Sequence, residues 1–130
     1  MKKILLIMLS IMFAVLSCKT ATAPIDSKRT GKYVSAKPVN GSSYLAIAFD
    51  DYAGGFGLYY STNKEGTKEA TTKVNTAAAE NISGQDPNYT FNTGVMAGSL
   101  QFISDTVIKV TVNFNDGSGS LKDILCYSNK

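Results

Sequence analysis

The residue best placed for chemistry is Cys18, because of the segment that precedes it. Two lysines follow the initiator methionine, and residues 4–16 then contain a single polar residue, Ser10. Small Ser17 comes next, directly before the cysteine. A positive end, an apolar middle and a small residue at the cut are the three parts of a secretory signal. We therefore expect residues 1–17 to be removed by cleavage between Ser17 and Cys18.

An uncut membrane anchor is the alternative for this segment. A helix over residues 4–16 would rise about 20 Å, whereas the hydrocarbon core of a bilayer is about 30 Å thick. The segment is therefore short for a transmembrane helix, and it has the length of the apolar part of a signal. The sequence favours cleavage over a permanent span.

The four residues that end the segment indicate which peptidase acts. Val15-Leu16-Ser17-Cys18 resembles the lipobox of bacterial prolipoproteins, in which an aliphatic, a variable and a small residue precede a cysteine. The resemblance covers residues 1–18. It implies that signal peptidase II cuts between Ser17 and Cys18, and that Cys18 carries a diacylglyceryl thioether and an N-acyl chain such as palmitate. A buried or disulfide-bonded cysteine is the alternative, but it leaves the position after an apolar run unexplained.

Lipidation of Cys18 would anchor the protein to a membrane without a span. Each buried methylene contributes about 0.8 kcal/mol, and one acyl chain alone binds a membrane only reversibly. Two or three acyl chains on one residue hold a protein stably in the membrane. The membrane is therefore the partner that the sequence predicts most directly.

Chain length and charge limit what the mature protein does. Removing residues 1–17 leaves 130 − 17 = 113 residues, which is enough for one domain. The two signal lysines leave with that segment, so the formal net charge falls from +3 to (13 − 2) − 10 = +1. A nearly neutral chain lacks the basic surface that nucleic-acid binding needs.

Catalytic side chains are scarce. The chain has no histidine, the commonest general base and metal ligand. Once Cys18 is lipidated, Cys126 has no other cysteine to pair with. Cys126 lies in the apolar run 124–127 and is expected to be a small buried hydrophobe, with a reactive thiol as the alternative. We therefore expect no enzyme activity and no cofactor.

Two acidic stretches could attract a cation but suit other roles better. Residues 113–118 superficially suggest a calcium loop, yet the EF-hand pattern needs glycine at position six and glutamate at position twelve. Here the glycine is at position five and position twelve is Ile124. Asp50 and Asp51 are adjacent, so in an extended chain they point to opposite faces. We expect a hairpin turn in the first case and a strand end in the second, with a weak cation site at Asp50 and Asp51 as the alternative.

Aromatic residues suggest one further contact. All seven tyrosines lie after the signal segment. Exposed rings could contact a sugar or a protein, whereas strands also favour aromatic residues for packing alone. Packing accounts for most of them. Tyr52 differs because it is expected at the tip of a loop, where burial is not its purpose, so it is the candidate exposed aromatic contact.

The amino-acid composition of the chain changes at about residue 31. Residues 19–30 are polar, contain Pro24 and show no apolar period, which predicts a flexible tether. Beyond them, short segments rich in Val, Ile, Tyr, Phe and Thr alternate with clusters of Gly, Asn, Asp and Ser, the pattern of strands and turns. The expected divisions are a cleaved signal over 1–17, a lipidated cysteine with its tether over 18–30, and a β-rich domain over 31–130.

The clearest expected strand covers residues 106–114, where apolar and polar residues alternate. The Asp-Gly pair that follows predicts a hairpin to a strand over 120–127. A second hairpin is expected between 43–49 and 56–61. Further strands are expected at 32–37, 70–74, 88–93 and 99–103, and residues 75–82 allow either a two-turn helix or a loop.

Eight such strands in meander order predict an all-β fold, a small antiparallel barrel or sandwich. Closure of the sheet would remove exposed edges that could otherwise pair with neighbouring molecules. The pattern leaves both the barrel and the sandwich open.

These features favour a lipid-anchored outer-membrane or surface lipoprotein with a structural, antigenic or adhesive role. In size, anchor and polar β-rich texture the chain loosely resembles small outer-membrane lipoproteins of spirochaetes or other diderm bacteria. Lys19 is not the aspartate that retains lipoproteins in the inner membrane of enteric bacteria, which favours the outer membrane, with the domain exposed or facing the periplasm. The alternative function is a small lipocalin-like module that binds a ligand. The sequence does not identify a protein or sugar partner.

Overall fold

The structure, a computed structural model, describes residues 25–26, 28–49 and 54–128. Within them the chain forms nine β-strands and no α-helix. In chain order the strands are β1 (Lys32–Ser35), β2 (Tyr44–Ala48), β3 (Phe56–Ser61), β4 (Thr71–Ala77), β5 (Ile82–Gln85), β6 (Asn88–Asn92), β7 (Met96–Phe102), β8 (Val107–Phe114) and β9 (Gly119–Ser128).

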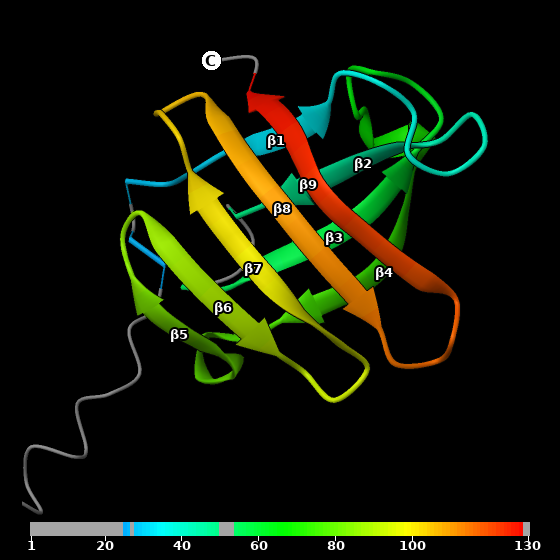
Figure 1. Ribbon diagram of the computed structural model, residues 1–130. Coiled ribbons are helices and arrows are strands. Elements are labelled where there is room, and N and C mark those ends of the chain that lie inside the picture. The colour runs from blue at the N-terminus through cyan, green and yellow to red at the C-terminus, as the bar shows by residue number, and fades with distance from the viewer. Residues whose placement is uncertain (1–24, 27, 50–53, 129–130) are drawn as a thin grey trace, which may run out of the picture.

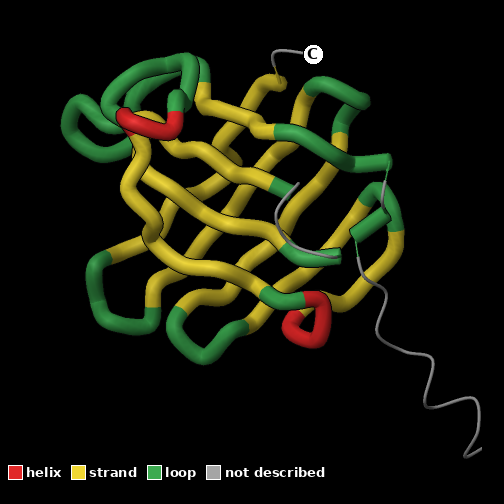
Figure 2. Tube along the Cα trace, turned by 180° about the vertical axis from the view of Figure 1, so that it is seen from behind, coloured by secondary structure: helices red, strands yellow, loops and turns green. Residues whose placement is uncertain are grey.

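All nine strands belong to one antiparallel sheet in the order β4-β3-β2-β1-β9-β8-β7-β6-β5. Neighbouring strands are consecutive in sequence except for β1 and β9, whose pairing joins the first strand to the last. The sheet curls, so that β5–β9 lie in front of β1–β4 in Figure 1, and Figure 2 shows the same curl from behind. It stays open between β4 and β5. The all-β prediction is confirmed, as a curled sheet that resembles half a barrel.

The core lies between the two layers of the curled sheet. Alternate residues of each strand face inward, because successive side chains of a strand point to opposite faces. On β8, the alternation predicted from the sequence places Ile108, Val110 and Val112 at the core, where all three are fully buried. Aromatic rings from both layers meet beside them. The ring centroids lie 5.1 Å apart for Phe56 and Phe91.

The β3–β4 loop covers part of the outer face of the sheet. Gly66 lies against Val34 of β1 and Ala46 of β2, and the Lys32 ammonium donates a hydrogen bond of 2.6 Å to the Gly66 carbonyl. Gly66 has a φ of +61°, and a Cβ there would lie 2.7 Å from a Val34 methyl carbon. Glycine is therefore required both by the backbone conformation and by the close approach. The loop buries Val34 and Ala46 on a face that would otherwise be open to solvent.

The structure differs from the sequence-based expectation around residues 75–82. In place of a two-turn helix or a loop, β4 continues to Ala77, a short 3₁₀ turn spans Ala79–Asn81, and a ninth strand, β5, begins at Ile82. Ala77 and Ile82 are both fully buried. The helical spacing of apolar residues in this stretch therefore reflects two strand ends that face one core, which a local pattern does not distinguish from a helix.

Ile25 and Asp26, in the stretch that the sequence predicts to be a tether, contact the folded domain. Ile25 is 5% exposed and belongs to the core, and its N–H donates to the Gly54 carbonyl at 3.0 Å. The Asp26 N–H points at the Tyr89 hydroxyl, 3.3 Å away. The lack of an apolar period in residues 25–30 predicts a tether there. A single apolar residue is enough to dock a segment when the surface it contacts comes from distant strands.

In the part of the chain that the structure describes, no helix has both the length and the apolar character needed to cross a bilayer. The expected signal segment, residues 1–17, lies outside the described residues.

Candidate functional site: a groove beside β9

Several residues singled out from the sequence lie outside the described residues. They are Ser17 and Cys18 at the expected cleavage and lipidation site, Asp50 and Asp51, and the loop residue Tyr52. The other cysteine, Cys126, lies on the inner face of β9 and is fully buried. Burial raises the pKa of its thiol to about 12. Because the thiolate is the nucleophile, Cys126 is unreactive in the folded protein.

Residues 113–118 form the end of β8 and the turn into β9, as the hairpin prediction states. The Asp116 carboxylate accepts a hydrogen bond of 2.8 Å from the Ser118 N–H, which closes the turn locally. Hydrogen bonds from the Ser118 side chain and backbone lower the pKa of Asp116. Among the described residues, no three His, Cys, Asp or Glu side chains are grouped so that they could hold a metal ion.

The most distinctive surface feature arises where β1 ends. The Ser35 hydroxyl accepts a hydrogen bond of 3.0 Å from the Leu45 N–H of β2 and donates one of 2.8 Å to the Lys37 carbonyl. The side chain thus takes the place of a backbone partner, and the main chain leaves the sheet after Ser35. Pro38 follows, and proline has no N–H to donate to a strand ladder. β1 is therefore only four residues long.

The short β1 leaves most of β9 without a neighbour on that side. β9 is ten residues long, but only residues 126–128 pair with β1. Leu125 comes directly before the paired segment. If β1 continued, its next residue, Ala36, would pair with Leu125, yet no backbone hydrogen bond joins the two residues in the described structure. One edge of β9 therefore opens at Leu125.

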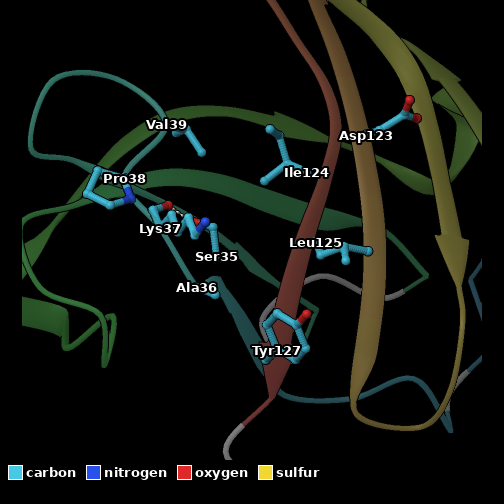
Figure 3. A pocket seen from close by; sticks show the side chains of 9 residues that line it. All are labelled: Ser35, Ala36, Lys37, Pro38, Val39, Asp123, Ile124, Leu125 and Tyr127. Carbon is cyan, nitrogen blue, oxygen red and sulfur yellow. Dashed lines mark hydrogen bonds between the residues drawn. The ribbon is translucent and has the colours of Figure 1, made fainter.

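A groove of about 500 Å³ lies between this open edge and the loop that follows β1. One wall comes from β9 and the other from residues 35–39, and Figure 3 shows the two sets of side chains on either side of the gap. Leu125 and Tyr127 are each 40% exposed, which is unusual for large apolar side chains in this protein. The volume is within the range of small-ligand and peptide pockets.

Two charged residues, Lys37 and Asp123, line the groove, but in Figure 3 the Asp123 carboxylate lies on the side of β9 away from Lys37, and Asp123 also lines the hollow on the outer face of β6–β8. Lys37 lies in the wall near Ser35, and Asp123 lies on β9 three residues before Cys126. Both residues are exposed. Asp123 has a φ of +54° at an irregularity where β9 shifts register against β8. At this irregularity the Asp123 N–H donates to the Thr111 hydroxyl of β8 at 3.1 Å.

A second, smaller hollow continues along the same side of β9. It has a volume of about 200 Å³ and lies between Val39 and Tyr60 on one side and residues 118–121 on the other. Val39 lines both hollows. A third hollow, of about 350 Å³, lies on the polar outer face of β6–β8 and shares Asp123 with the groove. The two hollows that share Val39 therefore follow the side of β9 that β1 leaves uncovered.

Sequence reasoning did not find this groove. The exposed aromatic residue described beside it is Tyr127, whereas Tyr52 was the one singled out. Pro38, so soon after a predicted strand, was the available signal that β1 is short. It does not reveal that β9 lies next to β1, because that pairing joins residues more than ninety positions apart.

Comparison of the chain with protein-family models, with curated proteins and with solved structures finds no significant match. Its function is therefore inferred from its own residues and geometry.

Proposed function

We propose that this protein is a lipid-anchored outer-membrane lipoprotein whose β-rich domain serves as a structural or adhesive module and catalyses no reaction. The observation that carries the proposal is the lipobox-like sequence Val15-Leu16-Ser17-Cys18 at the end of an apolar segment. Cys18 is the lipidated residue, and cleavage between Ser17 and Cys18 makes it the first residue of the mature chain.

The geometry of the domain supports a tether at one end and a binding surface at the other. Ile25 packs into the core, so only residues 19–24 separate the lipidated cysteine from the folded domain. Six residues span at most about 20 Å when fully extended. The chain then enters β1 (Figure 1), and Ser35 at the far end of this strand lines the groove. A lipid on Cys18 would therefore hold Ile25 within about 20 Å of the membrane surface.

The packing of the interior counts against the alternative, a lipocalin-like module with a ligand between the layers. Rings from both layers fill that space, with centroids 5.5 Å apart for Phe49 and Phe102 and 5.7 Å for Tyr33 and Phe49. A ligand in this part of the interior would have to displace close-packed side chains, which is costly. The groove on the outside of the sheet is better suited to a partner.

Metabolic labelling tests the lipid anchor. The full-length precursor, expressed in a diderm bacterium with radioactive palmitate, is expected to incorporate label, and the Cys18→Ser variant is expected to incorporate none. The Cys126→Ser variant is the matched control and is expected to be labelled like the parent, because Cys126 is buried. Absence of label on the parent chain would overturn the proposal.

Mass spectrometry and protease shaving sharpen the result. The mature chain is expected to begin at Cys18 with a mass that includes the lipid, and a mature chain that begins elsewhere contradicts the proposal. Protease added to intact cells then separates the two orientations, since a surface-exposed domain is digested and a periplasm-facing domain is protected. Full protection would remove the adhesive role and leave the structural one.

A further inference from the structure

We propose that Ile25, Asp26, Lys28 and Arg29, which lie before β1, form a detachable strap that leaves the domain while the sheet stays folded. Release of the strap lengthens the tether to the membrane. The strap itself depends only on the folded domain, whereas its effect on the tether rests on the proposed function.

The backbone of the strap is weakly attached. In the described structure these residues belong to no strand. The Ile25 N–H donates to the Gly54 carbonyl at 3.0 Å, and the Asp26 N–H donates to the Tyr89 hydroxyl at 3.3 Å. A strand inside a sheet has a ladder of backbone hydrogen bonds on each side. The strap can therefore leave the domain without breaking such a ladder.

The strap also forms hydrogen bonds within itself. The Asp26 carboxylate accepts a hydrogen bond of 2.9 Å from the Lys28 N–H, and the Asp26 carbonyl accepts one of 2.8 Å from the Arg29 N–H. An aspartate that bonds the backbone two residues on is a common turn-forming arrangement, and it does not need the rest of the fold. These bonds can persist after release, which keeps the backbone cost of release small.

Side chains supply most of the attachment. Ile25 is 5% exposed and packs into the core. Arg29 donates to the Asp86 carboxylate at 2.8 and 2.9 Å and to Asp105 at 2.9 Å, and its Cζ lies 4.6 Å from the centroid of the Phe102 ring. Burial of an apolar side chain and a bidentate charged pair both favour the docked state. Docking of the strap is therefore governed by two side chains, Ile25 and Arg29.

The sheet begins directly after the strap. The Phe49 N–H donates to the Gly31 carbonyl at 3.1 Å, and Tyr33, which is fully buried, pairs with both β2 and β9. Gly31 has a φ of +95°, a conformation that glycine adopts readily. A hinge consists of a few residues at the end of an element that absorb a change in backbone direction. Gly31 is placed as this hinge, and release ends where β1 is held on both sides.

Release of the strap changes how far the domain can reach. With the strap docked, residues 19–24 connect Cys18 to the domain, and six residues span at most about 20 Å. With the strap released, residues 19–30 make this connection, and twelve residues span at most about 40 Å. The tether therefore has two lengths, and the docked strap sets the shorter one.

Hydrogen exchange tests whether the strap opens separately from the sheet. The full-length protein in detergent micelles is followed by NMR at several low urea concentrations. We expect the Ile25 amide to be protected, yet to exchange at least tenfold faster than the Val110 amide in the middle of β8 and with a much weaker dependence on urea. The dependence on urea grows with the surface that an opening exposes, and release of the strap exposes little. An unprotected Ile25 amide, or one with the rate and urea dependence of Val110, would overturn the proposal.

Limited digestion with trypsin tests which contact holds the strap. The docked Arg29 side chain is 15% exposed and paired with Asp86, so cleavage after Lys28 or Arg29 requires release. The Asp86→Asn variant keeps both trypsin sites and removes the charge that faces Arg29. We expect it to be cleaved there about fivefold faster than the parent, as for the loss of a favourable pair. Mass spectrometry of the domain fragment, which then begins at Arg29 or Thr30, measures the rate.

Two comparisons control the digestion. Asp123→Asn removes an exposed carboxylate on β9, outside the contacts of the strap, and should leave the rate unchanged. Cleavage of the parent after Lys109, within β8, requires the sheet to unfold and should be at least tenfold slower than cleavage of the strap. Equal rates at the two sites, or an unchanged strap rate in Asp86→Asn, would contradict the proposal. Absence of palmitate label would remove the effect on the tether, while exchange and digestion would still decide whether the strap detaches.

Discussion

At the residue scale, Gly98 of β7 is a position where the core tolerates no side chain. It lies between Phe91 of β6 and Val112 of β8 in the sheet. A Cβ at residue 98 would overlap the Thr111 carbonyl oxygen and lie 3.0 Å from the end of the Phe91 ring. The absence of a side chain therefore lets Phe91 lie over the sheet, where it also contacts Phe56.

The Gly98→Ala variant is expected to lower the free energy of unfolding by about 1–3 kcal/mol, because the added methyl group overpacks a close-packed site. Urea unfolding monitored by circular dichroism measures the change. Ser99→Ala, at the next residue, which is exposed, is the control and should change the stability by less than about 0.5 kcal/mol. Equal stability of Gly98→Ala and the parent would show that the strands separate easily at this position.

At the scale of elements, the segment before β1 is held to the turns of the opposite layer. Arg29 donates two hydrogen bonds to the Asp86 carboxylate, at 2.8 and 2.9 Å, and one to Asp105 at 2.9 Å. Its guanidinium also stacks on Phe102, with Cζ 4.6 Å from the ring centroid. Asp86 lies in the β5–β6 turn and Asp105 in the β7–β8 turn. One arginine therefore links the N-terminal segment to two hairpins.

The Asp86→Asn variant tests this link through its dependence on pH. The hydrogen bond from Arg29 lowers the pKa of Asp86 in the folded protein. A lowered pKa means that the ion pair stabilises the fold above the pKa of the unfolded state, and that this stability is lost as the pH falls through the folded pKa. At neutral pH the variant should be less stable by about 1 kcal/mol, as for a favourable surface pair. Near pH 2 the difference should be close to zero.

The control for this prediction is Asp105→Asn. The Asp105 side chain is 99% exposed, compared with 32% for Asp86, so solvent screens its interaction with Arg29 more strongly. The variant is expected to change the stability less than Asp86→Asn at neutral pH. A difference between Asp86→Asn and the parent that persists unchanged at acid pH would exclude the ion pair as its cause.

At the scale of the whole molecule, Cys126 reports on the integrity of the curled sheet. It lies between the layers, and its pKa of about 12 keeps the thiol protonated at ordinary pH. Alkylation therefore requires the sheet to open. With Cys18 blocked by lipid or replaced by serine, iodoacetamide at pH 8 should leave the folded protein unmodified over a time that fully modifies the urea-unfolded chain, as measured by mass spectrometry. Equally fast modification of both states would show that β9 separates readily from the core.

The same pKa shift has a consequence for alkaline stability. The unfolded thiol loses its proton near its ordinary pKa of about 8.5, whereas the folded thiol keeps it up to about pH 12. As the pH rises through this window, deprotonation favours the unfolded state, so the contribution of Cys126 to stability falls. The Cys126→Ala variant lacks the thiol, so its free energy of unfolding should fall less than that of the parent as the pH rises through this range. Urea unfolding of both proteins at several pH values measures the difference.

The docked N-terminal segment and the groove beside β9 lie at different ends of the domain. The N-terminal segment docks through Ile25 and Arg29 beside the β5–β6 and β7–β8 turns. The groove lies at the other end of β1, where the chain leaves the sheet after Ser35. The docked N-terminal segment and the groove therefore lie at opposite ends of β1.

The amino-acid sequence by itself determined those features of the described domain that depend on neighbouring residues. The apolar run that ends in Ser17 and Cys18 also predicts a lipid anchor, because a peptidase acts on a short linear segment, and the anchor stays a prediction. The alternation over residues 106–114 predicts β8 and its buried face, because side-chain direction in a strand has a period of two. The Asp-Gly pair after β8 predicts the turn into β9 for the same local reason.

Only the tertiary structure decided which strands become neighbours and where an edge stays open. The pairing of β1 with β9 and the gap between β4 and β5 depend on contacts between residues far apart in the chain, which no local period encodes. No repeating pattern of apolar residues surrounds Ile25 in the sequence. It is nevertheless buried, because strands from distant parts of the chain form an apolar surface against which it packs. The groove follows from the same cause. It exists because a four-residue strand lies beside a ten-residue strand, and the difference in their lengths matters only once they pair.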